Sequence, residues 1–200
     1  MFRAVLFDFD GTLTRPEALD FARLRSLLSC PTGQPILEHI EALPSEAERQ
    51  KAWRILDEFE LAAARASVPN DGAEDLVLSL RASGVLLGIL SRNSRASVLE
   101  AMKRFAAIGP GDFSVLISRE SPGRPKPHPD GVELAARAFG LLPSQVLMVG
   151  DFVFDIQAGT SAGAGTAYLT NGKALPELSV RPDYVVGRLG DLKAILGLAG

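Results

Sequence analysis

Two carboxylates stand one residue apart near the start of the chain, directly after a short apolar run. Residues 4–7 form that run, which favours a buried strand, and Asp8, Asp10 and Gly11 follow it. Side chains two positions apart in a strand lie on one face, so Asp8 and Asp10 would repel each other without a cation or a shared proton between them. The pattern therefore predicts a site that binds a metal ion.

Other polar residues follow other apolar runs. Ser91 comes after the run over residues 85–90, and Asp151 comes after the run over 146–149, with Asp155 one helical turn later. Parallel α/β sheets bind ligands beyond the carboxyl ends of their strands, so these side chains are expected to meet at one edge. Several carboxylates at one edge make an oxygen site suited to Mg²⁺, which keeps water and substrate phosphate oxygens in its shell.

The same residues predict phosphoryl chemistry. A phosphate bound to the metal ion needs further donors, and Ser91 and Lys126 supply a hydroxyl and an ammonium group, together with backbone N–H groups. A carboxylate is ionised at neutral pH, so Asp8 can attack phosphorus once the metal ion and Lys126 screen the repulsion. Asp10 can then protonate the leaving oxygen and later deprotonate the water that cleaves the acyl phosphate.

Composition and charge exclude other classes of protein. The chain has 200 residues, 46% of them hydrophobic and 22% charged, which predicts one globular core with room for a small insert. A net charge of -3 argues against a nucleic-acid partner and favours a small phosphorylated metabolite. The single cysteine excludes an internal disulfide, and with only two histidines it disfavours zinc.

No apolar run approaches the length of a membrane span or of a signal peptide's apolar region. We therefore expect a cytoplasmic protein without a membrane partner. The sequence leaves open whether the protein is a monomer or a dimer.

The elements that position these residues alternate between strand and helix. Continuous apolar strands separated by helices predict an α/β fold, a doubly wound parallel sheet covered on both faces. The expected strands are 4–7, 85–90, 114–117, 146–149, 165–169 and 183–186, and the expected helices are 72–81, 96–107, 130–140, 154–162 and 192–196.

Residues 15–69 interrupt that alternation, because they carry helical patterns and no strand signal. Helices are expected over 16–28 and 36–43, and Ser45 with Glu48 forms a capping box ahead of a long helix. A cluster of turn-forming residues over 68–72 ends the segment. The sequence thus predicts a small all-helical unit inserted into an α/β core made of residues 1–14 and 70–200.

These motifs resemble those of the haloacid dehalogenase (HAD) superfamily of phosphohydrolases, in the same order and over nearly the whole chain. The four matching segments are Asp8-Phe9-Asp10-Gly11-Thr12, Ser91 within residues 89–93, Lys126 in Pro125-Lys126-Pro127, and Gly150-Asp151 through Asp155. The closest subgroup is that of phosphoglycolate phosphatase-like hydrolases, here with a shorter cap.

The resemblance implies a Rossmann-like core, with residues 15–69 as a type 1 cap. It implies that Asp8 is the nucleophile and Asp10 the acid/base, and an acid at position 10 favours phosphoryl chemistry over dehalogenation. It further implies that Mg²⁺ is held by Asp8, the backbone carbonyl of Asp10 and Asp151, with Asp155 supporting the ion directly or through water. The expected substrate contacts are Gly11, Thr12, Arg92 and Asn93 from the core, with Thr32 and Gln34 from the loop over 31–35, which resembles the cap loop that reaches over the site.

Other reactions remain open on the same fold. A phosphonate hydrolase would need a Schiff-base lysine in the cap, where Lys51 is the only lysine. The same motifs would also serve a phosphosugar mutase or a non-catalytic, regulatory phosphate-binding domain. The sequence does not identify the phosphate ester.

Overall fold

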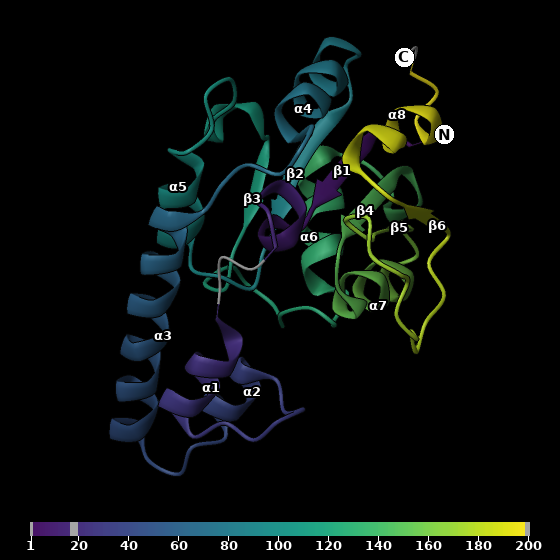
Figure 1. Ribbon diagram of the computed structural model, residues 1–200. Coiled ribbons are helices and arrows are strands. Elements are labelled where there is room, and N and C mark those ends of the chain that lie inside the picture. The colour runs from purple at the N-terminus through teal and green to yellow at the C-terminus, as the bar shows by residue number, and fades with distance from the viewer. Residues whose placement is uncertain (1, 17–19, 199–200) are drawn as a thin grey trace.

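The computed structural model describes residues 2–16 and 20–198, and its centre is a six-stranded parallel sheet with strand order β3-β2-β1-β4-β5-β6 (Figure 1). The strands occur where the apolar runs predict them, so the predicted α/β fold is confirmed. Their bounds are β1 Ala4–Phe7, β2 Leu86–Leu90, β3 Val115–Ile117, β4 Val146–Gly150, β5 Gly165–Leu169 and β6 Tyr184–Val186.

The register of the central strands brings the predicted polar residues to one edge. Phe7 at the end of β1 lies opposite Ile89 of β2 and Val149 of β4. The backbone N–H of Asp8 donates to the carbonyl of Val149 at 2.8 Å, which extends the pairing one residue beyond β1. The residues that follow these three strands therefore emerge side by side, at the point where the strand order reverses.

Helices cover both faces of the sheet. Alternate residues of β1 face the two sides, with Val5 and Phe7 in one buried cluster and Ala4 and Leu6 in the other. Burial on both faces explains why the strands are apolar without alternation. The first face is covered by α4 (Ala73–Ala82), α5 (Arg95–Met102) and α8 (Leu192–Ile195), and the second by α6 (Asp130–Phe139) and α7 (Val153–Ala162).

The segment over residues 15–69 contains α1 (Phe21–Leu28), α2 (Ile36–Glu41) and α3 (Glu46–Ala66), which lie together apart from the sheet (Figure 1). The capping box at the start of α3 is confirmed, because the Ser45 hydroxyl accepts the N–H of Glu48 and the Glu48 carboxylate accepts the N–H of Ser45. These helices share a buried cluster of their own, formed by Leu24, Leu28, Cys30, Leu37, Ile40, Ala52 and Leu56.

Two expected helix boundaries are wrong. Helix α1 begins at Phe21 rather than at Pro16, because the Asp20 carboxylate accepts the N–H of Arg23 and caps the helix there. Residues 17–19, which belong to the expected helix, lie outside the described residues. Helix α5 ends at Met102 rather than at residue 107, because the chain turns so that Phe105 and Ile108 are buried in the core.

The chain leaves and re-enters the sheet layer at adjacent points. The backbone N–H of Arg15 donates to the carbonyl of Val68 at 2.9 Å, and the N–H of Asn70 donates to the carbonyl of Leu13 at 2.8 Å. The division into an insert and a core at these points stays a prediction. No helix in the described part of the chain combines the length and the apolar character needed to cross a bilayer.

Candidate active site

A buried lysine joins two of the predicted carboxylates at the edge of the sheet. The Lys126 ammonium donates to Asp8 Oδ1 at 2.5 Å and to Asp155 Oδ1 at 2.6 Å, and the Lys126 side chain is only 3% exposed. Burial lowers the pKa of Lys126, but attraction by Asp155 and Asp8 outweighs that effect and holds the pKa above its usual value. Lys126 is therefore a permanent cation between these two acids.

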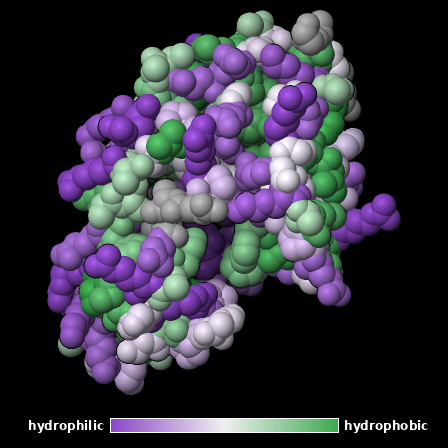
Figure 2. All heavy atoms as spheres, in the orientation of Figure 1, coloured by the Kyte–Doolittle hydropathy of each residue, from purple (hydrophilic) through white to green (hydrophobic). Residues whose placement is uncertain are grey.

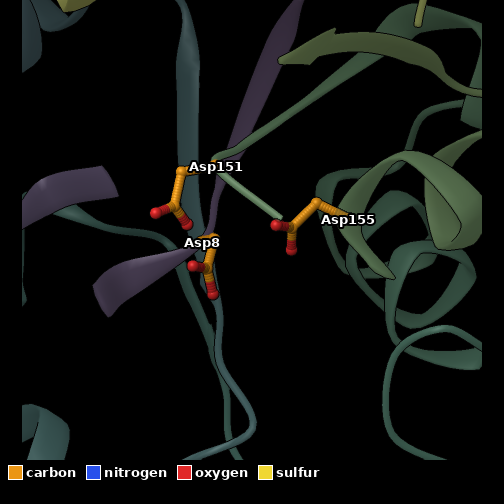
Figure 3. Close-up of side chains that lie close together, drawn as sticks. All are labelled: Asp8, Asp151 and Asp155. Atoms are coloured by element: carbon orange, nitrogen blue, oxygen red, sulfur yellow. The ribbon is translucent and has the colours of Figure 1, made fainter. Parts of the chain in front are cut away.

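Asp151 completes a group of three carboxylates. Asp8, Asp151 and Asp155 each offer an oxygen atom within 4.8 Å of the others, and the three side chains converge in Figure 3. When all three are ionised, the single charge of Lys126 leaves the group with an excess of negative charge. The all-oxygen donor set and this excess fit a hard divalent cation such as Mg²⁺.

The acids of this group titrate abnormally in the metal-free protein. Burial, reinforced by the charges of Asp8 and Asp155, raises the pKa of Asp151 to about 8. Burial likewise raises the pKa of Asp155 to about 6, although Lys126 opposes the change. A divalent cation would reverse these shifts, because it favours the ionised carboxylates.

Two glycines are required for this geometry. Gly11 has φ +76°, and a Cβ atom there would lie 2.1 Å from Asp151 Oδ2. A Cβ atom on Gly150 would lie 2.2 Å from the carboxyl carbon of Asp155. Glycine at both positions lets the backbone approach the carboxylates closely.

Asp10 lies beside this group and is held by Asn93. The Asn93 side-chain amide donates to Asp10 Oδ2 at 2.6 Å. Burial, with smaller contributions from the charges of Asp8 and Glu60, raises the pKa of Asp10 to about 7. A carboxyl group with a pKa near neutrality can both give and accept a proton, which suits an acid/base.

The segment after β2 provides the other predicted phosphate ligand. The Ser91 side chain is buried, and its hydroxyl oxygen accepts the backbone N–H of Asn93 at 3.1 Å. The hydroxyl of Ser94, not that of Ser91, caps α5 by accepting the N–H of Ser97. Ser91 is therefore not needed as the helix cap.

Thr12 is fully buried and does not face the cavity described next. Its carbonyl accepts the side-chain amide of Asn70 at 2.8 Å, and the side-chain amide of Asn171 donates to the carbonyl of Gly11 at 2.7 Å. Asn70 and Asn171 thus hold the turn after Asp10, and the sequence analysis missed both. The turn cluster around Asn70 was a signal for a loop, but not for this contact.

A cavity of about 520 Å³ lies between the carboxyl edge of the sheet and the helices of residues 15–69, and Figure 2 shows the molecule hollowed between these two parts. Its lining includes most of the predicted site residues, namely Asp8, Asp10, Gly11, Ser91, Arg92, Asn93, Lys126, Asp151 and Asp155. Thr32 and Gln34 are not among the lining residues, whereas their neighbours Gly33 and Pro35 are. A substrate contact by Thr32 or Gln34 stays a prediction.

Arg92 connects the two walls of this cavity. Its guanidinium donates to Glu38 Oε2 of α2 at 2.6 Å and to the backbone carbonyl of Lys126, and it lies 5.1 Å from the ring centroid of Phe154. Arg92 is thus tied to α2 and to the loop that carries Lys126. Lys51, in contrast, is exposed on α3 and does not line the cavity.

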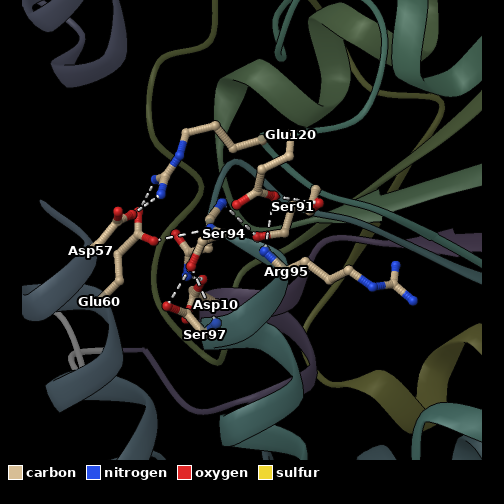
Figure 4. A network of polar contacts seen from close by, with 11 residues as sticks. Asp10, Asp57, Glu60, Ser91, Ser94, Arg95, Ser97 and Glu120 are labelled. Carbon is tan, nitrogen blue, oxygen red and sulfur yellow. Dashed lines mark hydrogen bonds and ion pairs between the residues drawn. The ribbon is translucent and has the colours of Figure 1, made fainter. Parts of the chain in front are cut away.

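A second connection joins α3 to the segments after β2 and β3 (Figure 4). The Glu60 carboxylate, 4% exposed, accepts the backbone N–H of Ser94 at 3.0 Å and pairs with Arg119 at 2.6 Å. Arg119 also pairs with Asp57 and lies 5.1 Å from the ring centroid of Trp53. Burial raises the pKa of Glu60, so its two partners are needed to keep it charged.

Sequence analysis missed Glu60 and Arg119 as parts of the site. The available signal was the spacing on α3, since Ala52, Leu56, Glu60 and Ala64 are its buried residues and recur every four positions. A glutamate within such an apolar stripe indicates a buried partner of opposite charge. Nothing in the sequence marks Arg119 as that partner.

Comparison with known proteins extends these observations beyond the chain itself. Residues 2–163 match the family described as haloacid dehalogenase-like hydrolases. An uncharacterized hydrolase of Saccharomyces cerevisiae is 33% identical over 171 residues, which are 84% of this chain and 78% of that protein. The phosphoglycolate phosphatase of Salmonella typhimurium is 30% identical over 186 residues, which are 91% of this chain and 72% of that protein.

Solved structures show the same fold. The crystal structure of a predicted phosphoglycolate phosphatase from Haemophilus somnus has a TM-score of 0.75 and 23% identity, and the match covers 98% of each chain. The similarity therefore includes the helices of residues 15–69 as well as the sheet.

Proposed function

The chain belongs to the haloacid dehalogenase-like hydrolases, and on that premise we propose that it hydrolyses the phosphate ester of a small metabolite with Mg²⁺ and an Asp8 phosphoenzyme. Its relatives include named phosphatases, so the enzyme is a phosphoric monoester hydrolase of phosphoglycolate phosphatase-like type. The observation that carries the proposed mechanism is the contact of Lys126 with Asp8 and Asp155 at the floor of the cavity, beside Asp151.

The metal site of this proposal uses Asp8, Asp151 and the backbone carbonyl of Asp10, with Asp155 acting directly or through water. Support for it comes from the three converging carboxylates and their excess of negative charge. Bound Mg²⁺ would stabilise negative charge on the phosphoryl group during its transfer.

The first chemical step is assigned to Asp8 and Asp10. An Asp8 carboxylate oxygen forms a bond to phosphorus while the bond from phosphorus to the ester oxygen breaks, and Asp10 donates its proton to the departing alkoxide. In the second step Asp10 takes a proton from water, whose oxygen attacks phosphorus and releases inorganic phosphate from Asp8. The hydrogen bond from Asn93 keeps the Asp10 carboxyl oriented for both transfers.

The remaining residues are proposed to hold the substrate. Lys126 and the Ser91 hydroxyl would neutralise and bind phosphate oxygens, with the backbone at Gly11 approaching closely enough to add an N–H group. Residues 15–69 would serve as the cap over the leaving group. The further proposed contacts are Thr12, Arg92, Asn93, Thr32 and Gln34, of which Arg92 and Asn93 line the cavity.

Hydrolysis of p-nitrophenyl phosphate by Asp8→Asn tests the proposal. With Mg²⁺ we expect turnover to fall by more than about 10³-fold, because the amide is not a nucleophile. Asp75→Asn is the matched control, since Asp75 is exposed on α4 and does not line the cavity. Chelation with EDTA should also stop the wild-type enzyme. Substantial turnover by a folded Asp8→Asn variant would contradict the covalent mechanism.

A further inference from the structure

The part of the cavity away from the carboxylates has apolar walls. Residues 15–69 provide one wall, and the β4–α7 connection provides part of the other. The apolar side chains that line the cavity are Phe21, Leu24, Ile36, Leu37, Leu56, Phe152 and Phe154.

Two of these side chains are exposed, although aromatic rings are normally buried. Phe21 at the start of α1 and Phe152 directly after Asp151 are each 55% exposed. Burying a phenylalanine side chain contributes about 1.5–3 kcal/mol, so rings left exposed at a cavity forgo that stabilisation unless a ligand covers them. Phe152 also meets the Phe154 ring edge-on at 4.9 Å, which fixes one face of the wall.

The charged residues of this region are already engaged by the protein. Arg15 pairs with Asp71 at 2.6 Å and Arg92 pairs with Glu38 at 2.6 Å. The Nη1 group of Arg25 donates to the carbonyls of Pro31 at 2.9 Å and of Gln34 at 2.6 Å, so it ties that loop to α1. A small anionic leaving group would therefore meet mainly apolar surface and committed arginines.

The size of the cavity points in the same direction. At about 520 Å³ it falls within the range of pockets that enclose large organic ligands rather than two-carbon acids. A two-carbon leaving group would leave water in contact with Phe21, Leu56 and Phe152, which is unfavourable.

We propose that the preferred substrate is a phosphate monoester whose leaving group is a bulky, ring-containing apolar alcohol, packed between Phe21 of α1 and Phe152 of the core. This inference rests on the proposed function, because it concerns the same site. It differs from the substrate named for the Salmonella typhimurium relative, whose leaving group is a small hydroxy acid.

The test compares kcat/KM for 2-phenylethyl phosphate, ethyl phosphate and phosphoglycolate, with p-nitrophenyl phosphate as a reactive reference. The alkyl alcohols have similar acidity, so differences between their esters report binding of the leaving group rather than intrinsic reactivity. Each buried methylene-sized increment is expected to add about fourfold, and 2-phenylethyl phosphate should exceed ethyl phosphate by at least about tenfold.

Variants locate the preference. Phe21→Ala and Phe152→Ala should each reduce the ratio of kcat/KM between the phenylethyl and ethyl esters by about fivefold or more, chiefly through KM. Leu142→Ala is the matched control, because Leu142 is 68% exposed and does not line the cavity, and it should leave the ratio unchanged.

The outcomes separate the two claims. Equal or better hydrolysis of ethyl phosphate or phosphoglycolate would overturn the inference and leave the phosphatase proposal standing, and so would an unchanged ratio in both phenylalanine variants. No hydrolysis of any ester, p-nitrophenyl phosphate included, would overturn the proposed function and the inference with it.

Discussion

The two ends of the cavity differ in how their side chains are held. At the sheet edge, Asp8, Lys126 and Asp155 make direct contacts of 2.5 and 2.6 Å, and glycines let the backbone approach the acids. On the side of α1–α3, Phe21 and Leu56 present apolar surface, and the charges behind it are paired within the protein. The difference indicates that the sheet edge supplies the chemistry and the helices supply the selection of the leaving group.

The comparison is tested most strongly by Lys126→Met. This change removes the only ammonium group in contact with Asp8 and Asp155 among the described residues, so kcat/KM should fall by about 10²–10³-fold for every ester alike. The metal-free protein should also lose about 3–5 kcal/mol of unfolding free energy, because two acids remain buried without their partner. Steady-state kinetics and urea unfolding measure both effects. Wild-type kcat/KM in this variant would contradict the assigned role.

Gly11→Ala is expected to have the next largest effect. Its Cβ would lie 2.1 Å from Asp151 Oδ2, so Asp151 must move and kcat should fall by about 10²-fold. Gly72→Ala is the matched control, because Gly72 has the same φ of +76° and nothing within 4 Å of the added Cβ. We expect both variants to lose about 1 kcal/mol of stability from backbone strain, but only Gly11→Ala to lose activity. Equal activity in the two variants would show that the close approach is unimportant.

Glu60→Gln tests the connection between α3 and the sheet. The change weakens the pairing with Arg119 and the acceptor for Ser94, so stability should fall by about 1–3 kcal/mol, with a several-fold loss in kcat/KM. Asp57→Asn removes the other partner of the same arginine, and because Asp57 is 56% exposed it should cost less than about 1 kcal/mol. Urea unfolding compares the variants, and a larger loss in Asp57→Asn would contradict the account.

The smallest expected effect is a pH dependence of stability in the metal-free protein. The pKa values of Asp155, Asp10 and Asp151 are raised to about 6, 7 and 8, so the folded state binds these protons more tightly than the unfolded chain. Their contribution to stability is present at low pH and is lost as pH rises through these values. In EDTA we expect unfolding free energy to fall by at least about 1 kcal/mol between about pH 5 and about pH 8. Mg²⁺ should reduce this fall, and a rise in EDTA would contradict the assignment.

The sheet and the ends of its strands follow from the sequence, because each buried strand is a continuous apolar run with chemistry-bearing residues directly after it. Asp8, Ser91 and Asp151 could be placed at one edge for that reason. Lys126 could not be placed this way, since its loop has no regular periodicity, and only the family resemblance indicated its role.

Contacts between the helices of residues 15–69 and the sheet could not be predicted. Glu60 lies on the apolar stripe of α3, but its partner Arg119 follows β3 and meets it only through tertiary packing. The start of α1 was misplaced for a local reason, because the Asp20 cap competes with Pro16 as a helix start. The exposed rings of Phe21 and Phe152 likewise have meaning only once the cavity between them is known.

Trapping the phosphoenzyme tests the central claim most directly. In Asp10→Asn, an aryl phosphate with a good leaving group needs no proton donor, whereas hydrolysis of the acyl phosphate lacks its base, so the intermediate should accumulate. Acid quenching, borohydride reduction and peptide mass analysis should then find homoserine at position 8 in the presence of substrate and Mg²⁺. Homoserine at another aspartate, or at none while phosphate is still released, would contradict the assignment of Asp8 as the nucleophile.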